Sequence, residues 1–525
     1  MTATDTPSLN PAPKATQREW IGLAVLALPC LLYAMDLTVL NLAVPHLSAD
    51  LGPTSTELLW IIDIYGFVVA GALIPMGVYG DRIGRRKLLL IGAAFFGVAS
   101  IFAAFAGSVA QLIAARAVLG LAAATLAPST LSLIRNMFLD ERERTVAIGI
   151  WISSFSAGGA IGPVLGGVLL EYFWWGSVFL LNVPIMLLLL AVGPFLLSEY
   201  RDPDAGRPDL VSAGLSLATT LAVIYGIKRI AESGPDAVAL ATIAAGIAIG
   251  YVFVQRQKRL AQPFIDLALF RRPSFTAALG INIVAVFAAF GSFLFVAQYL
   301  QLVIGLSPLE AGLWSAPSGI TFIIGSNLTP VLVRHVSRVS VVTGGLALTA
   351  ASFVVMAQVT GGRGDLALVV TAYVLMSLGM ASVFTLTTDF IIGAAPPERA
   401  GLAAGMAETS SEFGGALGIA ILGSVVTAIY RPTVGADLPP NLPADAAAAA
   451  RDTLGGALAA AAQLTDGLGE ALVATARAAY VDSFQVISII SAAALALAAA
   501  IAFQALRNLS NPAPTPDLDL PGEAP

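Results

Sequence analysis

Four carboxylates fall inside long apolar stretches of this sequence: Asp36, Asp63, Glu408 and Glu412. A charge at the centre of a lipid bilayer costs about 2.5–3.5 kcal/mol on insertion scales. Several such acids in one chain therefore indicate that they serve the function of the protein. A carboxylate in that setting can bind a proton or attract a cation. Glu408 and Glu412 are four residues apart and share one helix face, where like charge and burial favour proton uptake. A fifth acid, Asp389, lies nearer the end of its stretch.

Each acid also has a structural explanation. We expect Arg116 to be the only basic residue at comparable depth, and it is a candidate ion-pair partner for Asp36. Asp63 could simply hydrogen-bond a neighbouring helix, and Asp389 could reach the membrane interface. The excess of five acids over one base still predicts a central region that favours cations. Tyr33 and Tyr65 could add cation–π surfaces, although packing explains any single aromatic equally well.

The composition indicates that lipid surrounds the elements that position these residues. Hydrophobic residues make up 57% of the 525 and charged residues only 11%, with a mean hydropathy of +0.84. A soluble domain is typically about 25% charged. The apolar residues form blocks of roughly 20, enough for a helix to cross about 30 Å of hydrocarbon. We therefore expect fourteen spans, at residues 20–44, 59–80, 87–107, 109–130, 147–170, 177–197, 210–230, 237–255, 274–302, 308–332, 341–360, 366–392, 400–430 and 482–505.

The distribution of basic residues orients these spans. With the N-terminus inside, 20 of the 27 Lys and Arg residues fall in inside segments and six in outside segments, with Lys228 counted among the six. Because cytoplasmic loops carry an excess of Lys and Arg, this asymmetry places both termini in the cytoplasm of a multi-pass protein of the cell membrane. The single cysteine, Cys30, excludes a disulfide framework within the chain.

Glycine and basic residues alternate between the second and third spans, in the segment Gly77, Asp81, Arg82, Gly84 and Arg85. The glycines allow a tight reversal, and Asp81 among basic residues can form a switchable ion pair at the cytoplasmic rim. The segment could also be only a positively charged anchor. Its spacing, G-x-x-x-D-R-x-G-R-R-K, resembles the signature loop of the major facilitator superfamily.

A glycine stripe marks the fifth span. Gly158, Gly162 and Gly166 are spaced at four and lie on one face, which lets another helix approach closely. Pro163 removes a backbone donor in mid-helix and is expected to bend the span. Ordinary small-residue packing explains any single glycine as well, but the combination favours a gating hinge. This stretch resembles the antiporter motif of the same superfamily.

Further stretches narrow the resemblance. Residues 112–120, with Arg116, resemble the fourth-span motif of proton-coupled members, and residues 36–45 resemble the first-span motif of fourteen-span drug:proton antiporters. With residues 60–65 following, the chain resembles pumps that export quaternary ammonium compounds and ethidium. The resemblance implies proton coupling through Asp36, Glu408, Glu412 and Arg116. It implies substrate binding by Asp36, Asp63, Glu408 and Glu412, to which we add Tyr33 and Tyr65 as candidates.

The implied fold is an all-α major facilitator fold of two six-helix bundles plus two extra spans. The expected organisation is an N-terminal tail (1–19), a first bundle (20–200), a linker with two extra spans (201–273), a second bundle (274–505) with a long outer loop (431–481), and a C-terminal tail (506–525). We expect both tails to be cytoplasmic. The Ala-rich loop is expected to form short helices at the outer mouth or to be a disordered connector.

The sequence lacks the motifs that several other functional classes require. None of the four lysines closes a phosphate-binding G-x-x-x-x-G-K-[ST] loop, and one cysteine with two histidines offers no metal cluster. We expect no cofactor, no metal, no nucleic-acid partner and no enzymatic activity. The expected function is proton-coupled export of cationic small molecules by a monomer in the bilayer. The alternatives are an exporter of an endogenous metabolite or antibiotic, a facilitator without proton coupling, and a non-transporting membrane sensor.

Overall fold

A computed structural model describes residues 14–201, 209–260, 263, 265, 267, 269–394, 400–464 and 467–507. All of the regular structure in these residues is helical. The first thirteen residues, the segment 202–208 and the tail from 508 onward fall outside the described residues. Of the expected tails at 1–19 and 506–525, the structure therefore describes only residues 14–19 and 506–507. Helices are the expected solution, because a spanning segment in lipid must satisfy its backbone hydrogen bonds internally.

The helices follow the apolar blocks closely. The first half comprises α1 (Gln17–Leu51), α2 (Ser55–Ile83), α3 (Arg85–Ala104), α4 (Val109–Met137), α5 (Glu141–Tyr172), α6 (Ser177–Leu180) and α7 (Asn182–Leu196). Two inserted helices follow, α8 (Leu210–Ser233) and α9 (Ala237–Gln257). The second half comprises α10 (Pro273–Gln298), α11 (Pro308–Leu332), α12 (Arg338–Met356), α13 (Asp365–Gly393), α14 (Ala400–Ala436), α15 (Ala444–Asp452), α16 (Leu454–Ala461) and α17 (Leu468–Arg507).

Thirteen helical segments of the described chain are long and apolar enough to cross a membrane. The fourteenth expected span corresponds to α11, which is 25 residues long and packs between α5 and α13 but carries more polar residues. The prediction of a many-span, all-α membrane protein is therefore confirmed. The expected span at 177–197 is divided between α6 and α7, and α10 continues through a π-helical turn to Val303.

Capping residues mark where several spans begin. Thr16, Thr54 and Ser307 each form a capping box with the glutamate three residues later, at the starts of α1, α2 and α11. In such a box, side chains satisfy backbone N–H groups that have no partner within the helix. The boundaries of these spans are therefore fixed locally by the sequence.

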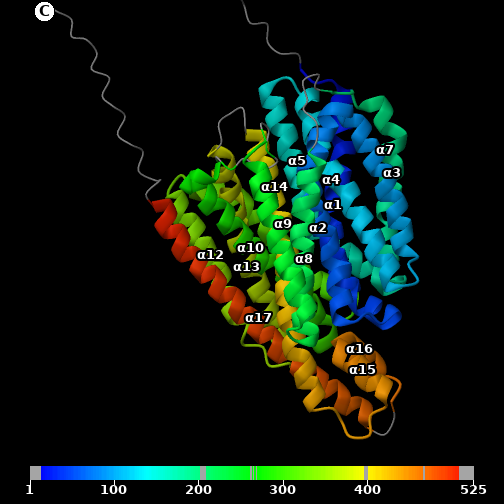
Figure 1. The fold of residues 1–525 in the computed structure, drawn as a ribbon. Helices are drawn as coiled ribbons and strands as arrows, with labels where there is room; N and C mark the ends of the chain where they lie inside the picture. The colour runs from blue at the N-terminus through cyan, green and yellow to red at the C-terminus, as the bar shows by residue number, and fades with distance from the viewer. Residues whose placement is uncertain are drawn as a thin grey trace, which may run out of the picture.

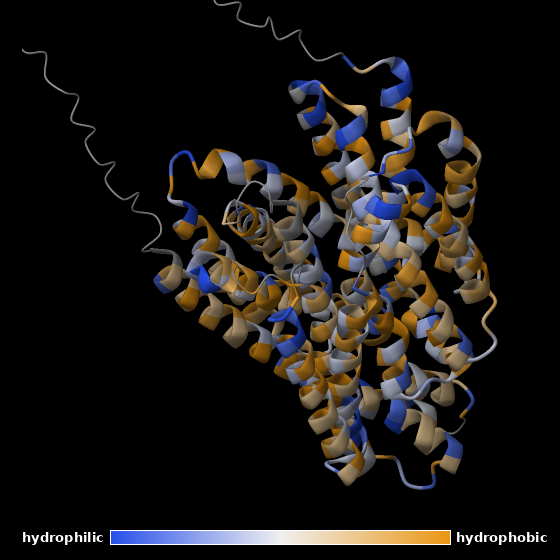
Figure 2. Ribbon diagram, turned by 45° about the horizontal axis from the view of Figure 1, so that its top comes forward, coloured by the Kyte–Doolittle hydropathy of each residue, from blue (hydrophilic) through white to orange (hydrophobic). Residues whose placement is uncertain are grey.

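The helices form two bundles with the inserted pair between them (Figure 1). Both ends of the described chain lie at one end of the molecule, which we call the terminal face; α15 and α16 lie at the other, which we call the loop face. Polar residues gather toward the two ends and apolar residues cover the sides between them (Figure 2). The stretch expected as a loop at 431–481 contains the end of α14, the helices α15 and α16, and the first turns of α17.

The two halves contact each other mainly through α5 with α11 and through α2 with α14. Among the described residues, direct hydrogen bonds between the halves lie near mid-helix or toward the loop face. Toward the loop face, the Gln301 side chain donates to the Leu42 carbonyl at 3.1 Å, and the Leu309 amide donates to Glu171 at 3.5 Å. The ribbons of the halves diverge toward the terminal face (Figure 1). The loop face is thus the closed end of this arrangement.

Candidate functional site

One hydrogen bond at mid-bundle joins the two halves directly. The Tyr33 hydroxyl of α1 donates to the Glu412 carboxylate of α14 at 2.5 Å. Both residues lie near the middle of long apolar helices, as the sequence predicts. The structure therefore brings together a candidate substrate-binding tyrosine and a candidate coupling acid from opposite halves.

Glu408 lies one turn before Glu412 on α14, and both side chains are partly buried. The Glu408 carboxylate is close enough to Tyr33 and to Glu412 to interact with them electrostatically. In the part of the chain that the structure describes, no Lys or Arg lies within ion-pair distance of either glutamate. This pair can therefore accept a proton or an external cation without displacing an internal counter-ion.

Asp36 and Arg116 form a buried ion pair, with Arg116 Nη1 2.5 Å from Asp36 Oδ2. This pair is the structural explanation that the sequence offered for an acid at position 36. Their residues are only 8% and 1% exposed. The Arg116 guanidinium also donates to the carbonyl oxygens of Ile61 and Ile62 on α2, and it lies 4.5 Å from the centre of the Tyr65 ring. This arrangement connects α1, α2 and α4 through one cation.

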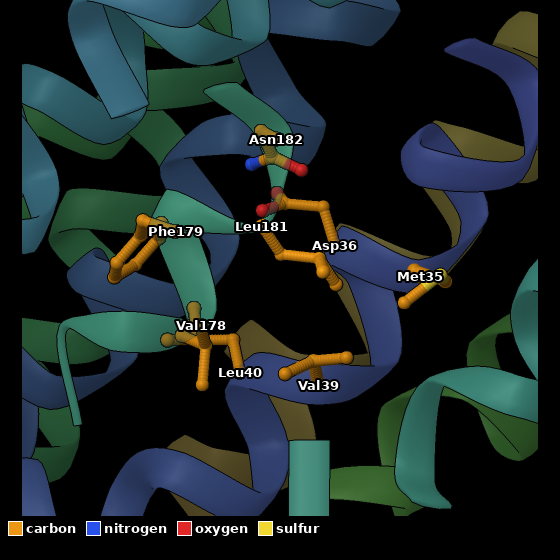
Figure 3. A pocket seen from close by; sticks show the side chains of 8 residues that line it. All are labelled: Met35, Asp36, Val39, Leu40, Val178, Phe179, Leu181 and Asn182. Carbon is orange, nitrogen blue, oxygen red and sulfur yellow. The ribbon is translucent and has the colours of Figure 1, made fainter. Parts of the chain in front are cut away.

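Asp36 also lines a small pocket between α1 and the α6–α7 segment (Figure 3). Met35, Val39 and Leu40 come from α1 on one side, and residues 178, 179, 181 and 182 come from the other. The pocket is too small for a drug-sized molecule, and Asp36 and Asn182 line it from opposite sides.

Asp63 pairs with a lysine that the loop-charge pattern assigned to an outside segment. Lys228 of α8 lies with its Nζ 2.7 Å from Asp63 Oδ2, and both side chains are fully buried. The prediction that Lys228 belongs to an outside segment, and that Arg116 is the only buried base, is therefore wrong. The signal was available, because Lys228 falls within the apolar block predicted at 210–230. Asp63 therefore has an internal counter-ion, Lys228, in contrast to Glu408 and Glu412 in the described structure.

Asp389 behaves as its structural explanation predicts. Its carboxylate pairs with Arg338 at 2.8 Å, and both side chains are more than half exposed. Exposed pairs of this kind contribute little to stability. Asp389 therefore lies apart from the buried acids.

Aromatic side chains surround the Tyr33–Glu412 contact. The Tyr33 ring lies 6.3 Å from that of Tyr65 and 5.8 Å from that of Phe155, which in turn stacks edge-on against Trp151 at 4.8 Å. The Tyr65 hydroxyl is buried without a hydrogen-bond partner in the described structure. Aromatic faces beside carboxylates are suited to lipophilic cations, because the ring quadrupole attracts positive charge.

The basic loop after α2 is held within its own half. Asp81 accepts from Arg85 at 2.6 Å, which is the ion pair the sequence predicts at this rim. Glu199, which the sequence analysis missed, accepts from the backbone amides of Arg86 and Lys87 at 2.9 and 3.1 Å. Gly84 has a φ of 112°, and a Cβ there would collide with the Glu199 carboxylate. Gly77 of α2 precedes the Asp81–Arg85 ion pair, and Arg82, which lies between its two members in the sequence, is exposed.

The glycine stripe of α5 packs against α1, as its spacing predicts. A Cβ at Gly158 would overlap the Leu31 carbonyl, one at Gly162 the Thr38 side chain, and one at Gly166 would lie 2.7 Å from Val39. Elsewhere on α5, the Pro163 carbonyl lies where a Cβ on Gly312 of α11 would be. Helix α5 continues through Pro163 without a break. It packs against α1 of its own half and against α11 of the other half.

Comparisons with known proteins identify the family of this chain. The sequence model of the Major Facilitator Superfamily matches residues 26–419. The multidrug efflux pump LfrA of Mycolicibacterium smegmatis is 42% identical over 502 residues, which cover 96% of this chain and 98% of LfrA. The methyl viologen resistance protein SmvA of Salmonella typhimurium is 36% identical over 477 residues, covering 89% and 94% of the two chains.

The fold also matches a solved structure. A bacterial homologue of the human lysosomal transporter Spinster, in an inward-facing and unoccupied conformation, superposes with a TM-score of 0.61 at 17% identity. The match covers 95% of this chain and all of the other. From the helical architecture, the matched family model and the full-length relatives, the chain belongs to the major facilitator superfamily and is a multi-pass membrane transporter.

Proposed function

We propose that this transporter exports lipophilic cations from the cell in exchange for protons. The observation that carries the proposal is the Glu408/Glu412 pair, which lacks a basic partner in the described structure. Glu412 accepts from Tyr33, whose ring contacts those of Tyr65 and Phe155. The names of its relatives LfrA and SmvA, a multidrug efflux pump and a methyl viologen resistance protein, support the same substrate class.

The proposed cycle uses one site in two arrangements. We take the terminal face as cytoplasmic, from the excess of Lys and Arg in the segments there. A cation then enters from the cytoplasm and binds the ionised form of the pair, in the arrangement described here. When the loop face opens, a proton from outside binds a carboxylate of the pair, neutralises it and releases the cation. Return of the proton to the cytoplasm restores the negative charge.

The Asp36–Arg116 pair has a supporting role in this proposal. Arg116 is fixed by Asp36, by two carbonyl oxygens of α2 and by the Tyr65 ring. It therefore holds α1, which carries Tyr33, against α2 and α4. Protonation of Asp36 would weaken this contact, so the proposal includes Asp36 as a second coupling acid.

Ethidium efflux tests the proposal. Cells producing the Glu412→Gln variant are expected to retain ethidium like cells without the transporter, because the amide neither binds a proton reversibly nor attracts a cation. Glu470→Gln, at an exposed acid of α17 on the loop face, is the matched control and should export normally. An uncoupler should abolish efflux by the native protein.

Two results would reject the proposal. Efflux that continues in the presence of the uncoupler would indicate a facilitator. An absence of proton flux on adding ethidium or methyl viologen to proteoliposomes would reject proton exchange for these cations, and a panel of neutral antibiotics would then test the exporter of an endogenous compound.

A further inference from the structure

The inserted helix α8 covers only one of the two seams between the halves. At the α5–α11 seam the helices meet through small residues, with Gly312 against Pro163 and Gly319 against Ala160. At the α2–α14 seam, α8 packs against both helices, while α9 packs on α8 (Figure 1). Helix α8 is therefore placed to take part in any motion between the halves.

A fully buried ion pair connects α8 to the first half. Lys228 contacts Asp63 of α2 at 2.7 Å, and its Nζ lies 3.9 Å from the centre of the Trp60 ring. Asp63 has no other side-chain partner in the described structure. Removing either charge would leave the other buried and uncompensated, so this contact strongly resists separation.

The contacts of α8 with the second half are weaker. Near the loop face, Glu232 lies 3.4 Å from Arg431 of α14, and both side chains are more than a quarter exposed. Among the described residues, an apolar cluster at this seam includes Ile224 of α8 together with Ala416 and Ala420 of α14. Partly exposed ion pairs contribute little. Apolar contacts in a membrane can be exchanged for lipid, which is equally apolar.

Glu232 also connects the two halves across the seam. One carboxylate oxygen accepts from the Thr56 hydroxyl of α2 at 2.8 Å, while the other faces Arg431 of α14. Arg431 has a second acid, Asp452 of α15, at 3.7 Å. If the seam opened beside Glu232, Arg431 would keep Asp452 as its partner.

We propose that Lys228 is a positioning residue that fixes α8 to the first half through Asp63, so that Glu232 acts as a latch against Arg431 that opens with the loop face. The inserted helix then travels with α2 and closes the seam at each return. This inference rests on alternating access in the proposed function, but on no particular substrate.

Distances between spin labels test which half α8 follows. The labels are placed at exposed positions on a Cys30→Ala background: Ser233→Cys on α8 with Ala49→Cys on α1, and Ser233→Cys with Ala436→Cys on α14. We expect one distance for the first pair, and a second, longer distance for the other pair when pH is varied or tetraphenylphosphonium is added. A changing Ala49–Ser233 distance, or two fixed distances, would overturn the proposal.

The latch has its own variant. Arg431→Gln should increase the longer Ser233–Ala436 population, because it removes the charge that holds Glu232. Arg229→Gln is the control: Arg229 pairs with Asp236 at the α8–α9 turn, so the population should stay as in the native protein. Equal populations in both variants would reject the latch.

Paired substitutions test the anchor. Asp63→Asn and Lys228→Met should each lower the amount of folded protein in the membrane and its ethidium efflux. The double variant should recover both, because it leaves no unpaired charge. Folding without efflux in the double variant would assign Asp63 a direct role in transport instead. Recovery of neither would overturn the anchor, because a mere anchor needs only that no charge is left unpaired. The distance measurement does not require ethidium, so a failure of the proposed function would remain distinguishable.

Discussion

Arg116 illustrates how one buried charge can organise several helices. It meets Asp36 of α1, two carbonyl oxygens of α2 and the Tyr65 ring, although it lies on α4. Both members of the ion pair are nearly inaccessible to solvent. In that setting the attraction must offset the loss of hydration, and a remaining unpaired charge is strongly destabilising.

The first prediction concerns this pair. Arg116→Met should lower the free energy of unfolding by about 3–5 kcal/mol, because it leaves Asp36 buried and unpaired. Thermal unfolding in detergent measures the change. The double variant Arg116→Met with Asp36→Leu should be closer to the native protein in stability while remaining inactive in efflux. A double variant less stable than Arg116→Met would contradict this account.

Asp236 gives a prediction for pH. It caps α9 by accepting from the Ala239 amide at 2.7 Å, and Arg229 donates to it at 2.6 Å. The hydrogen bond from Arg229, followed by that from Ala239, lowers the pKa of Asp236 below its ordinary value of 3.8. A lowered pKa means that the ionised form stabilises the folded state above pH 3.8, and that this stabilisation is lost as pH falls through the lowered pKa.

We therefore expect the melting temperature of the native protein to exceed that of Asp236→Asn at pH 7, with the difference shrinking below pH 3.8. Thermal scans of both proteins across this range check the expectation. A difference that stayed constant with pH would mean that the ionisation of Asp236 contributes nothing.

At the scale of the element, the stripe on α5 depends on the absence of side chains. Gly158 lies against the Leu31 carbonyl of α1, whereas its neighbour Gly159 has open space where a Cβ would be. The two glycines share a helix and differ in what they face. The stripe therefore offers a matched pair of substitutions.

Gly158→Ala should destabilise the protein by about 1–3 kcal/mol, the usual cost of adding volume to a packed contact. It should also slow ethidium efflux, because α5 contacts α11 of the other half as well as α1. Gly159→Ala should leave stability and efflux near native levels. Unfolding and efflux measured side by side give the comparison, and equal effects of the two substitutions would argue against close packing as the cause.

At the scale of the whole molecule, closure of the loop face depends on contacts that would have to separate in an alternating cycle. Gly312 of α11 lies against the Pro163 carbonyl near that face. Gly312→Ala should therefore disfavour the closed loop face and increase the longer distance between labels at Ala49 and Ala436. Gly280→Ala, where a Cβ meets open space on α10, should leave the distance distribution unchanged. Identical distributions for both variants would contradict the expected wedge effect.

The spans and most of the buried charges could be predicted from the amino-acid sequence. Apolar blocks of about 20 residues must form helices in lipid, because a single segment of that length can satisfy its backbone hydrogen bonds internally only as a helix. Glycines spaced at four predicted a close helix contact on one face of α5, since residues four apart share a helix face, but they did not identify α1 as the partner. Asp81 and Arg85 are also four apart on adjoining helical segments, and their ion pair was predictable from local spacing.

The pairing of the buried charges depends on how the helices pack, which the sequence does not show. Lys228 and Asp63 are 165 positions apart, and Tyr33 and Glu412 are 379 apart. Spacing along one helix gives the direction of a side chain, but it does not say which helix lies opposite. That depends on how fourteen similar apolar surfaces pack, where lipid and protein are nearly equivalent partners. The arrangement left Glu408 and Glu412 without a basic partner in the described chain and gave Asp63 one, and this difference distinguishes the proposed exchange site from the proposed anchor.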